Sequence, residues 1–224
     1  MTVDPAMLEA EVRAHLNLSA PRTMVVLEPL KVTLTNIVSD LSYELSVANI
    51  PDQPEKGSHP VTFGRVVYIE REDFKPEGEK GFRRLTKDQC VGLKHAGYVI
   101  RLTKVVNANE IEAEATPVEE AESKPKAFIH WVSDPVEVTV RLYERLFKHK
   151  NPEDPEVVPG GFLEDVNRDS KREITALADR SVLGAKNLDK FQFERQGYFS
   201  VDEDSEGNNL VFNRTVSLKE DSHK

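Results

Sequence analysis

The sequence predicts an all-β protein built as two antiparallel β-barrels, with one short helix at its N-terminal end. After Pro21 the apolar residues recur with a period of two, which indicates strands whose alternate side chains face a core. About twelve such segments follow, separated by turns rich in proline and glycine. So many short strands exceed what one small barrel needs, whereas two closed barrels leave no exposed sheet edge.

The chain begins with a predicted helix that Pro21 ends. Asp4 is a typical N-cap residue, and Pro5 suits the first helical position because its φ is already helical and no N–H is needed there. The apolar side chains that follow are spaced as on one face of a helix. They are Met7, Leu8, Val12 and Leu16.

The strands follow in a regular series with few interruptions. We expect them at residues 23–28, 30–36, 42–48, 61–69, 97–106, 109–116, 127–132, 136–145, 172–178, 190–194, 198–201 and 210–218. Short helical turns are expected at 71–75 and 162–166. The acidic, alanine-rich stretch 112–126 is the best candidate for a linker, because it divides the strands about evenly.

Charge alone does not select a partner. The formal net charge of −9 weakly disfavours a polyanion. Residues 80–104 nevertheless contain seven basic residues and a single acidic one, Asp88. Because the screening length at physiological salt is roughly 8 Å, a ligand bound there would respond mainly to this segment. A solvated charged face explains the same pattern.

Composition and cysteine content favour the cytosol. The longest apolar runs are too short to span a membrane, and no secretory signal opens the sequence. The single cysteine, Cys90, can form no intrachain disulfide. We therefore expect a cytoplasmic protein without a membrane partner.

No catalytic constellation, metal site or cofactor site is predicted. The six histidines lack metal-ligand spacing, and no glycine-rich phosphate loop occurs. His130, Ser133 and Asp134 lie too close together on one strand to act as base, nucleophile and orienting group. The chain by itself is therefore not expected to be an enzyme.

A binding function fits the residue types better. Arginine offers a planar fork of donors and glutamine an amide that both donates and accepts, so both suit base edges and phosphates. The candidates are Arg22, Arg83, Arg84, Lys94, Gln192 and Arg195. Aromatic residues could stack on unpaired bases, but at strand spacing we expect them mainly in the core. These are Phe82, Tyr98, Phe193 and Tyr198.

Six motifs resemble one known family. They are VLEPLKVTLTN (26–36), YIEREDF (68–74), FIHWVSDPVEVTVRLYERLF (128–147), NPEDPEVVPGGFL (151–163), FQFERQGYF (191–199) and VFNRTVSLK (211–219). In order and spacing they resemble the C-terminal anticodon-binding region of the glutaminyl-tRNA synthetases, and the eukaryotic form more than the bacterial one. The likeness runs from about Asn17 to the end of the chain.

The resemblance implies two β-barrels of the ribosomal 5S-RNA-binding protein type. It implies a helical connection over residues 1–20, a first barrel over 21–122 and a second over 123–224, whose last strands could return toward the first. The class I catalytic domain of the family, which uses ATP, would precede them, and its HIGH-like and KMSKS-like motifs are absent here. The implied partners are tRNA(Gln) and that catalytic domain.

The resemblance also assigns roles to candidate residues. Arg22, Gln192 and Arg195 match positions that hold the middle anticodon base, a uracil, where the barrels meet. Arg84, beside Arg83, matches the position that reads the third base, a guanine.

Two further residues match positions of the family, although residues elsewhere in the site differ from those of the bacterial members. Asn17 matches a residue near the anticodon stem, and Lys94 matches a basic position near the first base. Gly92 stands where bacterial members carry arginine, and Asp52 replaces an asparagine. Readout of the first base therefore departs from the bacterial pattern.

The spacing of Gln192 and Arg195 raises a geometric problem. Residues three apart on an ideal strand point to opposite faces. If both serve one base, a β-bulge or strong twist is needed between Phe193 and Gly197 to redirect one side chain.

Three other classes remain open. A glutamyl-tRNA synthetase shares the barrels, although FQFERQGYF and IHWVS look more glutaminyl. A free 5S-RNA-binding barrel would need only one barrel and no preceding helix. A protein-interaction module would bind without the salt dependence that phosphate contacts produce.

Overall fold

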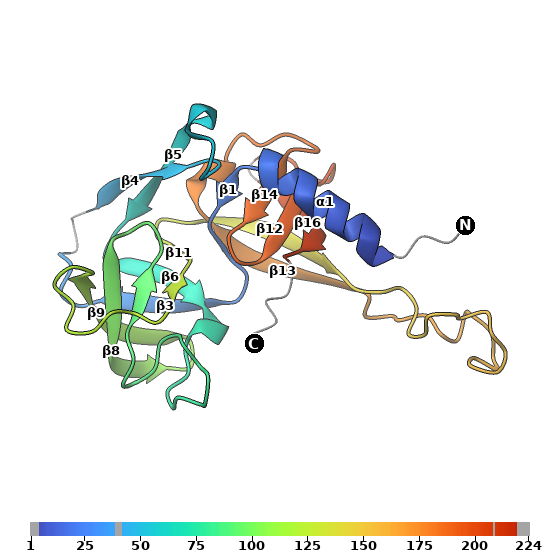
Figure 1. Ribbon diagram of the computed structural model, residues 1–224, viewed down its shortest axis with the longest axis horizontal. Helices are drawn as coiled ribbons and strands as arrows, with labels where there is room; N and C mark the ends of the chain where they lie inside the picture. The colour runs from blue at the N-terminus through green and yellow to red at the C-terminus, as the bar shows by residue number, and fades with distance from the viewer. Residues whose placement is uncertain (1–4, 39–41, 208, 219–224) are drawn as a thin grey trace.

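The computed structural model describes residues 5–38, 42–207 and 209–218, and these form two β-barrels with one helix (Figure 1). The helix, α1 (Pro5–Ser19), begins with proline as expected, while its predicted N-cap, Asp4, lies outside the described residues. Leu16 is buried and Val12 partly buried against the second barrel. The other two residues of the predicted apolar stripe are exposed. Only half of that stripe therefore packs.

The first barrel is one seven-stranded sheet. Its order is β10 (Phe128–Ile129), β7 (Val91–Leu93), β8 (Tyr98–Asn107), β9 (Glu110–Pro117), β3 (Pro29–Leu34), β6 (Val66–Glu70) and β11 (Trp131–Val132). The two end strands, β10 and β11, are consecutive pieces of one segment bent at His130. One segment thus pairs with both edges of the sheet and draws them together.

The second barrel repeats this plan. Its order is β1 (Arg22–Thr23), β14 (Lys190–Phe193), β15 (Gly197–Val201), β16 (Val211–Ser217), β12 (Val136–Tyr143), β13 (Lys171–Ala178) and β2 (Val25–Val26). Its end strands, β1 and β2, are again one segment, bent at Met24. In both barrels, therefore, strands far apart in the sequence lie side by side.

The barrels exchange their closing segments. Residues 22–26, early in the chain, close the sheet formed by the C-terminal strands, and residues 128–132 close the sheet formed by the earlier ones. The last strand, β16, stays in the second barrel between β15 and β12. The division at residue 122 stays a prediction; strand pairing shows only that segments cross it.

Each barrel has its own apolar core. Trp131 and Phe63 are among the largest buried side chains of the first core, and Phe193 and Phe212 of the second. The closing segments contribute to both, since Trp131 lies in one and Val25 in the other. Removing either segment would expose both a core and two sheet edges.

Most of the predicted elements are present, with informative differences. Three predicted strands, 23–28, 61–69 and 127–132, are each split in two, and β7 was not predicted. The strand pairs are mostly antiparallel as expected, but each seven-stranded sheet also contains two parallel pairs. The predicted linker is wrong in part: residues 112–117 belong to β9, with Ala113 and Ala115 in the core.

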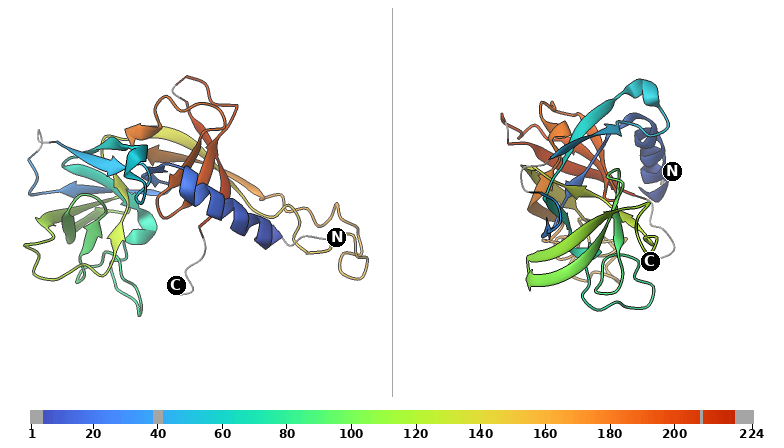
Figure 2. Two further views of the ribbon diagram at one scale, coloured as in Figure 1. Left: turned by 45° about the horizontal axis from the view of Figure 1, so that its top comes forward. Right: turned by 90° about the vertical axis from the view of Figure 1, so that its left-hand side faces the viewer.

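Two insertions occupy equivalent places in the two barrels. Between β3 and β6 the chain forms the hairpin of β4 (Tyr43–Ala48) and β5 (Ser58–Phe63), with η1 (Pro54–Lys56) at its turn. Between β12 and β13 residues 144–170 form a long loop that extends away from both barrels (Figures 1 and 2). The turn predicted at 162–166 lies in this loop as hydrogen-bonded turns. The turn predicted at 71–75 is η2 (Arg71–Asp73).

Candidate nucleic-acid interface

Arg22 and Gln192 are direct neighbours on paired strands. β1 runs parallel to β14, with Arg22 and Gln192 as register partners, and Gln192 N donates to Pro21 O at 2.8 Å. The Arg22 guanidinium donates to Asn17 O and Asn17 Oδ1, each at 2.9 Å, and to Ala20 O at 3.2 Å. These bonds satisfy carbonyls at the end of α1, where a cation is favoured. Asn17, Arg22 and Gln192 therefore form one group.

Gln192 has an unused acceptor inside this group. Its Oε1 is buried and has no hydrogen-bond partner in the described part of the chain. A buried amide oxygen without a partner costs free energy, on the order of 1–3 kcal/mol. A ligand that donates a hydrogen bond here would remove that cost.

Arg84 and Arg195 form a second group around one carboxylate. Asp73, at the end of η2, is fully buried, and its two oxygens accept from Arg195 Nη1 and Nη2, both at 2.7 Å. Arg84 Nε lies 3.1 Å from Asp73 Oδ1. Both arginine side chains remain partly exposed, at 25% and 29%. Asp73 thus fixes two cations whose outer edges face solvent.

Arg195 keeps a free pair of donors. A guanidinium has five N–H groups. Asp73 takes one from each terminal nitrogen, and His130 Nδ1 accepts the other from Nη1 at 3.4 Å. The parallel N–H groups on Nε and Nη2 have no partner among the described residues. Such a fork matches the two acceptors of a base edge or a phosphate.

His130 and Glu70 continue a chain of hydrogen bonds that begins at Arg195. Because Arg195 donates to Nδ1 of His130, the ring donates through Nε2 to Glu70, at 3.3 Å. Gln196 Nε2 also donates to Glu70, at 2.8 Å. Burial raises the pKa of Glu70, but hydrogen bonds from His130 and from the backbone of residues 27 and 28 outweigh it and leave the pKa lowered.

Lys94 binds a carboxylate from the other barrel. Lys94 Nζ pairs with Glu194, which is 4% exposed, and His95 Nε2 lies 2.8 Å from the same carboxylate. Burial raises the pKa of Glu194, but the hydrogen bond from His95 and the charge of Lys94 outweigh it and hold the pKa at about 2. Lys94 is therefore next to the Arg195 turn, joined to it through Glu194.

The predicted bulge between Phe193 and Gly197 is wrong, because the chain turns there. Phe193 pairs with Gly197 across a hairpin, and Gln196 N donates to Phe193 O at 2.9 Å. Arg195 occupies the turn with a φ of 67°, a conformation usually left to glycine. The turn takes Arg195 off the strand, toward Asp73. The one register shift in this hairpin region lies between Tyr198 and Phe199 of β15.

The remaining predicted residues divide into core and surface. Arg83 is exposed and makes no hydrogen bond or ion pair with the described residues. Phe193 and Tyr198 are buried, and Tyr98 stacks on Phe63 with ring centroids 5.2 Å apart. Their expected place in the core is confirmed. Phe82 is half-buried, with Lys75 Nζ 5.1 Å from its ring centroid.

The supporting acids were not predicted. Asp73, Glu70 and Glu194 hold the candidate cations, yet in a chain with 39 acidic residues nothing marks these three. His130 was considered only as part of a catalytic group. In the structure Ser133 Oγ donates to Val66 O, and Asp134 pairs with Arg180, so the three do not form a catalytic triad.

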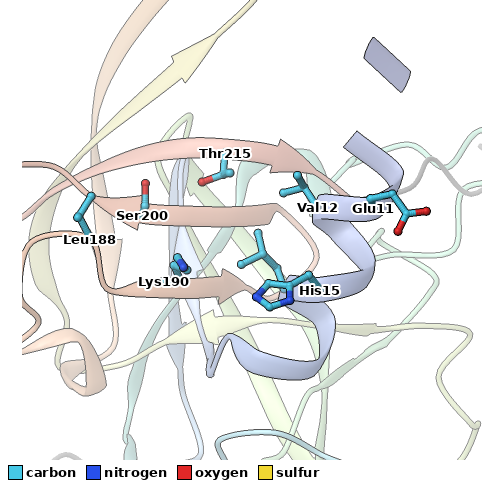
Figure 3. Close-up of a pocket in the computed structure, with 8 residues that line it drawn as sticks. Glu11, Val12, His15, Leu188, Lys190, Ser200 and Thr215 are labelled. Carbon is cyan, nitrogen blue, oxygen red and sulfur yellow. The ribbon is translucent and has the colours of Figure 1, made fainter. Parts of the chain in front are cut away.

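A groove lies elsewhere, between α1 and the second barrel. It measures about 580 Å³, and Figure 3 shows Val12 and His15 of the helix on one side and Lys190 and Ser200 of the strands on the other. None of the predicted RNA-binding residues lines it. Within the described ranges no cluster of His, Cys, Asp or Glu could hold a metal ion, and no helix has the length and apolarity to cross a membrane.

Comparison with known proteins shows the family of the chain. Residues 20–118 and 128–202 match two families, both described as tRNA synthetases class I (E and Q), anti-codon binding domain. Together the two matches cover most of the chain. The chain therefore belongs to the anticodon-binding domains of the class I tRNA synthetases for E and Q.

The individual relatives carry more specific names. A probable glutamine–tRNA ligase of Drosophila melanogaster is 54% identical over 230 residues, and the glutamine–tRNA ligase of Bos taurus is 55% identical over 228. Both matches cover 100% of this chain and 29% of the relative. A cytoplasmic glutamine–tRNA ligase of Arabidopsis thaliana is 42% identical, covering 95% of this chain. The chain thus spans less than a third of the length of these relatives.

Proposed function

We propose that this chain is the anticodon-binding part of a glutamine–tRNA ligase and that it binds the anticodon loop of tRNA(Gln). The relatives' names, which are those of glutamine–tRNA ligases, support the choice of amino acid. Joined to a class I catalytic domain that uses ATP, the chain would supply affinity and selectivity for glutaminylation. We further propose that it acts in the cytoplasm, as the Arabidopsis relative's name states for that protein.

The observation that carries the proposal is that Arg84 of the first barrel and Arg195 of the second share the Asp73 carboxylate, with Arg195 three residues along the chain from Gln192. Arg195 presents a free donor fork. Arg84, on the same Asp73 carboxylate, donates through Nη1 to Glu72, and its Nη2 has no partner among the described residues. Gln192 Oε1 offers a buried acceptor beside Arg22. Uracil has one ring N–H flanked by two carbonyl oxygens, so its N–H can donate to an acceptor such as Gln192 Oε1 while a neighbouring oxygen accepts from a guanidinium. We assign the middle base to the Arg22–Gln192 group with Arg195, and the third base to Arg84.

The other predicted residues have positioning or phosphate roles in this proposal. Asn17 orients Arg22 through its side-chain oxygen. Lys94 and Arg83 add positive charge at the edge of the site, where phosphate contacts fix the RNA without reading its sequence. Release of counterions by these cations would make the affinity fall steeply with salt.

Arg84 and Arg83 provide a matched test. Arg84→Ala should cost about 1–3 kcal/mol in binding and relax selectivity at the third anticodon base. Arg83→Ala, which removes a neighbouring exposed cation, should weaken all tRNAs alike. The measurement is a titration of each variant against tRNAs that differ only in the third base. An unchanged base preference in Arg84→Ala would remove Arg84 from the readout.

The amino-acid assignment needs a separate comparison. The 224-residue chain should bind tRNA(Gln) more tightly than tRNA(Glu), with an affinity that falls as salt rises. Equal binding of both, or tighter binding of tRNA(Glu), would favour a glutamyl enzyme instead. Tighter binding of 5S RNA, or an affinity for protein that ignores salt, would overturn the anticodon role altogether.

A further inference from the structure

The two barrels carry the same backbone site with different side chains. In the second barrel, Arg22 of the closing segment pairs in parallel with Gln192. In the first barrel, Phe128 of the other closing segment pairs in parallel with Gly92. The backbone bonds also correspond, because Gly92 N donates to Ala127 O at 2.9 Å as Gln192 N donates to Pro21 O. Phe128 is thus the counterpart of Arg22, and Gly92 of Gln192.

The first barrel is built to present the Phe128 ring. Phe128 is 48% exposed, although most other phenylalanines of the described chain are buried or partly buried. A Cβ on Gly92 would lie 2.3 Å from Cδ1 of the ring, closer than any real contact. Glycine is therefore the residue at position 92 that leaves the ring where it is. The ring is therefore both exposed and held in one place by its glycine partner, so its face is available to a ligand.

Two basic residues precede the ring in the chain. They are Lys124 and Lys126, and both are exposed without a hydrogen bond or ion pair to the described residues. Lys94 follows Gly92 by two residues, and its carboxylate partner, Glu194, belongs to the Arg195 turn. The acidic residues nearest in sequence, Glu120 and Glu122, precede Lys124. Exposed rings among unpaired cations are how proteins hold single-stranded nucleic acids.

We propose that Phe128 is a stacking platform for an unpaired base of the anticodon loop, with Lys124 and Lys126 binding adjacent phosphates. This rests on the proposed function and adds a second kind of contact to it. The Arg22–Gln192 site reads base edges through hydrogen bonds. The Phe128–Gly92 site holds a base by its face, and every base has such a face. It therefore contributes affinity without base selectivity.

The test uses the 224-residue chain and a labelled synthetic anticodon stem-loop of tRNA(Gln). Phe128→Leu, which keeps an apolar side chain but loses the π face, should weaken binding roughly 5- to 100-fold. The loss should be the same for stem-loops carrying each of the four bases at any one anticodon position. Phe128→Tyr should bind within about 2-fold of the wild type. Binding of Phe128→Leu equal to that of the wild type would overturn the inference.

A second variant reports stacking directly. Phe128→Trp should retain binding, and its added fluorescence should be quenched when RNA saturates the site, while the buried Trp131 of the wild type gives the baseline. Emission that does not change at saturation would contradict stacking. If the wild type itself fails to bind the stem-loop, the proposed function fails. If the wild type binds with the expected salt dependence but Phe128→Leu binds as tightly and the emission of Phe128→Trp does not change, only the Phe128 inference fails.

Discussion

The two turns that follow β7 and β14 have the same shape and opposite chemistry. His95 and Arg195 occupy them with φ angles of 65° and 67°, a conformation rare outside glycine. The residue before each differs in charge, Lys94 in one turn and Glu194 in the other, and these two pair with each other across the barrel junction. The two turns share one backbone geometry, and their side chains form an ion pair that joins the barrels.

The same contrast holds for the paired residues on the strands that precede these two turns. Arg22 and Gln192 present donors and an unfilled acceptor, whereas Phe128 and Gly92 present an exposed ring. In the proposed function, one fold used twice therefore offers two ways of holding a base, by its edge and by its face. Substitutions of Asp73 or Glu194 break contacts that join the two barrels, whereas substitutions at the Phe128 site change the first barrel alone.

The largest effect is expected at Asp73, which holds cations from both halves of the chain. Asp73→Asn removes the negative charge between Arg84 and Arg195 and should cost about 3 kcal/mol or more of unfolding free energy, because both cations lose a buried partner. Denaturant unfolding measures this. Asp179→Asn is the matched control: Asp179 is equally buried but bonds Thr23 and Met24 instead.

The control separates stability from recognition. Asp179→Asn should destabilise the fold but leave base selectivity as in the wild type, whereas Asp73→Asn should also relax selectivity at the second and third anticodon bases. If the two variants changed selectivity alike, the special role of Asp73 would be refuted.

The second prediction concerns pH. The folded pKa of Glu194 is about 2, below its ordinary value of 4.5, so its ion pairs stabilise the protein above pH 4.5 and are lost as pH falls toward 2. The shift corresponds to about 3 kcal/mol. Glu194→Gln should therefore be less stable than the wild type at pH 7, and the gap should close between about pH 5 and 2 in unfolding experiments. If the difference in stability between Glu194→Gln and the wild type did not change with pH, the proposed ion-pair role of Glu194 would be contradicted.

The third prediction uses glycine as a probe of the Phe128 site. Gly92→Ala should displace the ring and weaken RNA binding by part of the loss seen in Phe128→Leu, while combining the two should add nothing further. Gly78→Ala is the matched control, because its Cβ would meet only Thr86 Cγ2 at an ordinary 3.6 Å. Additive losses in the double variant would mean that Gly92 acts independently of the ring.

The smallest effect is expected at Lys126. Lys126→Gln should weaken every stem-loop by a similar factor and lower the slope of log affinity against log salt by about 1. Binding measured over a series of salt concentrations tests this. A slope unchanged from the wild type would exclude a phosphate contact by this lysine.

How far the sequence predicts this molecule depends on the range of the interactions involved. The helix and the twelve strand segments follow from local periodicity, and all are present in the described residues. β7 is only three residues, Val91–Leu93, with glycine at its centre, so it shows no alternation. The bends at Met24 and His130 depend on which sheets the flanking residues join, and that information is not local.

In the candidate site, too, the local features were predictable from the sequence and the long-range contacts were not. Residue type and family likeness selected Arg22, Arg84, Gln192 and Arg195, and the structure brings them together in two groups. Asp73 could not be selected, since its partner Arg195 is 122 residues away and an acid beside Glu72 looks like ordinary surface. Phe128 was not a candidate, because only its pairing with Gly92 in the structure makes it the counterpart of Arg22 in the first barrel.

The most direct test of the account is a matrix of affinities for two variants and the wild type against stem-loops with each base at the middle anticodon position. Gln192→Leu breaks no hydrogen bond of Oε1 in the free protein, so its effect reports on the RNA complex. We predict that Gln192→Leu flattens the preference for uracil, while Phe128→Leu lowers all four affinities and keeps that preference. The opposite pattern, or a uracil preference that survives in Gln192→Leu, would contradict the division between edge reading and face stacking.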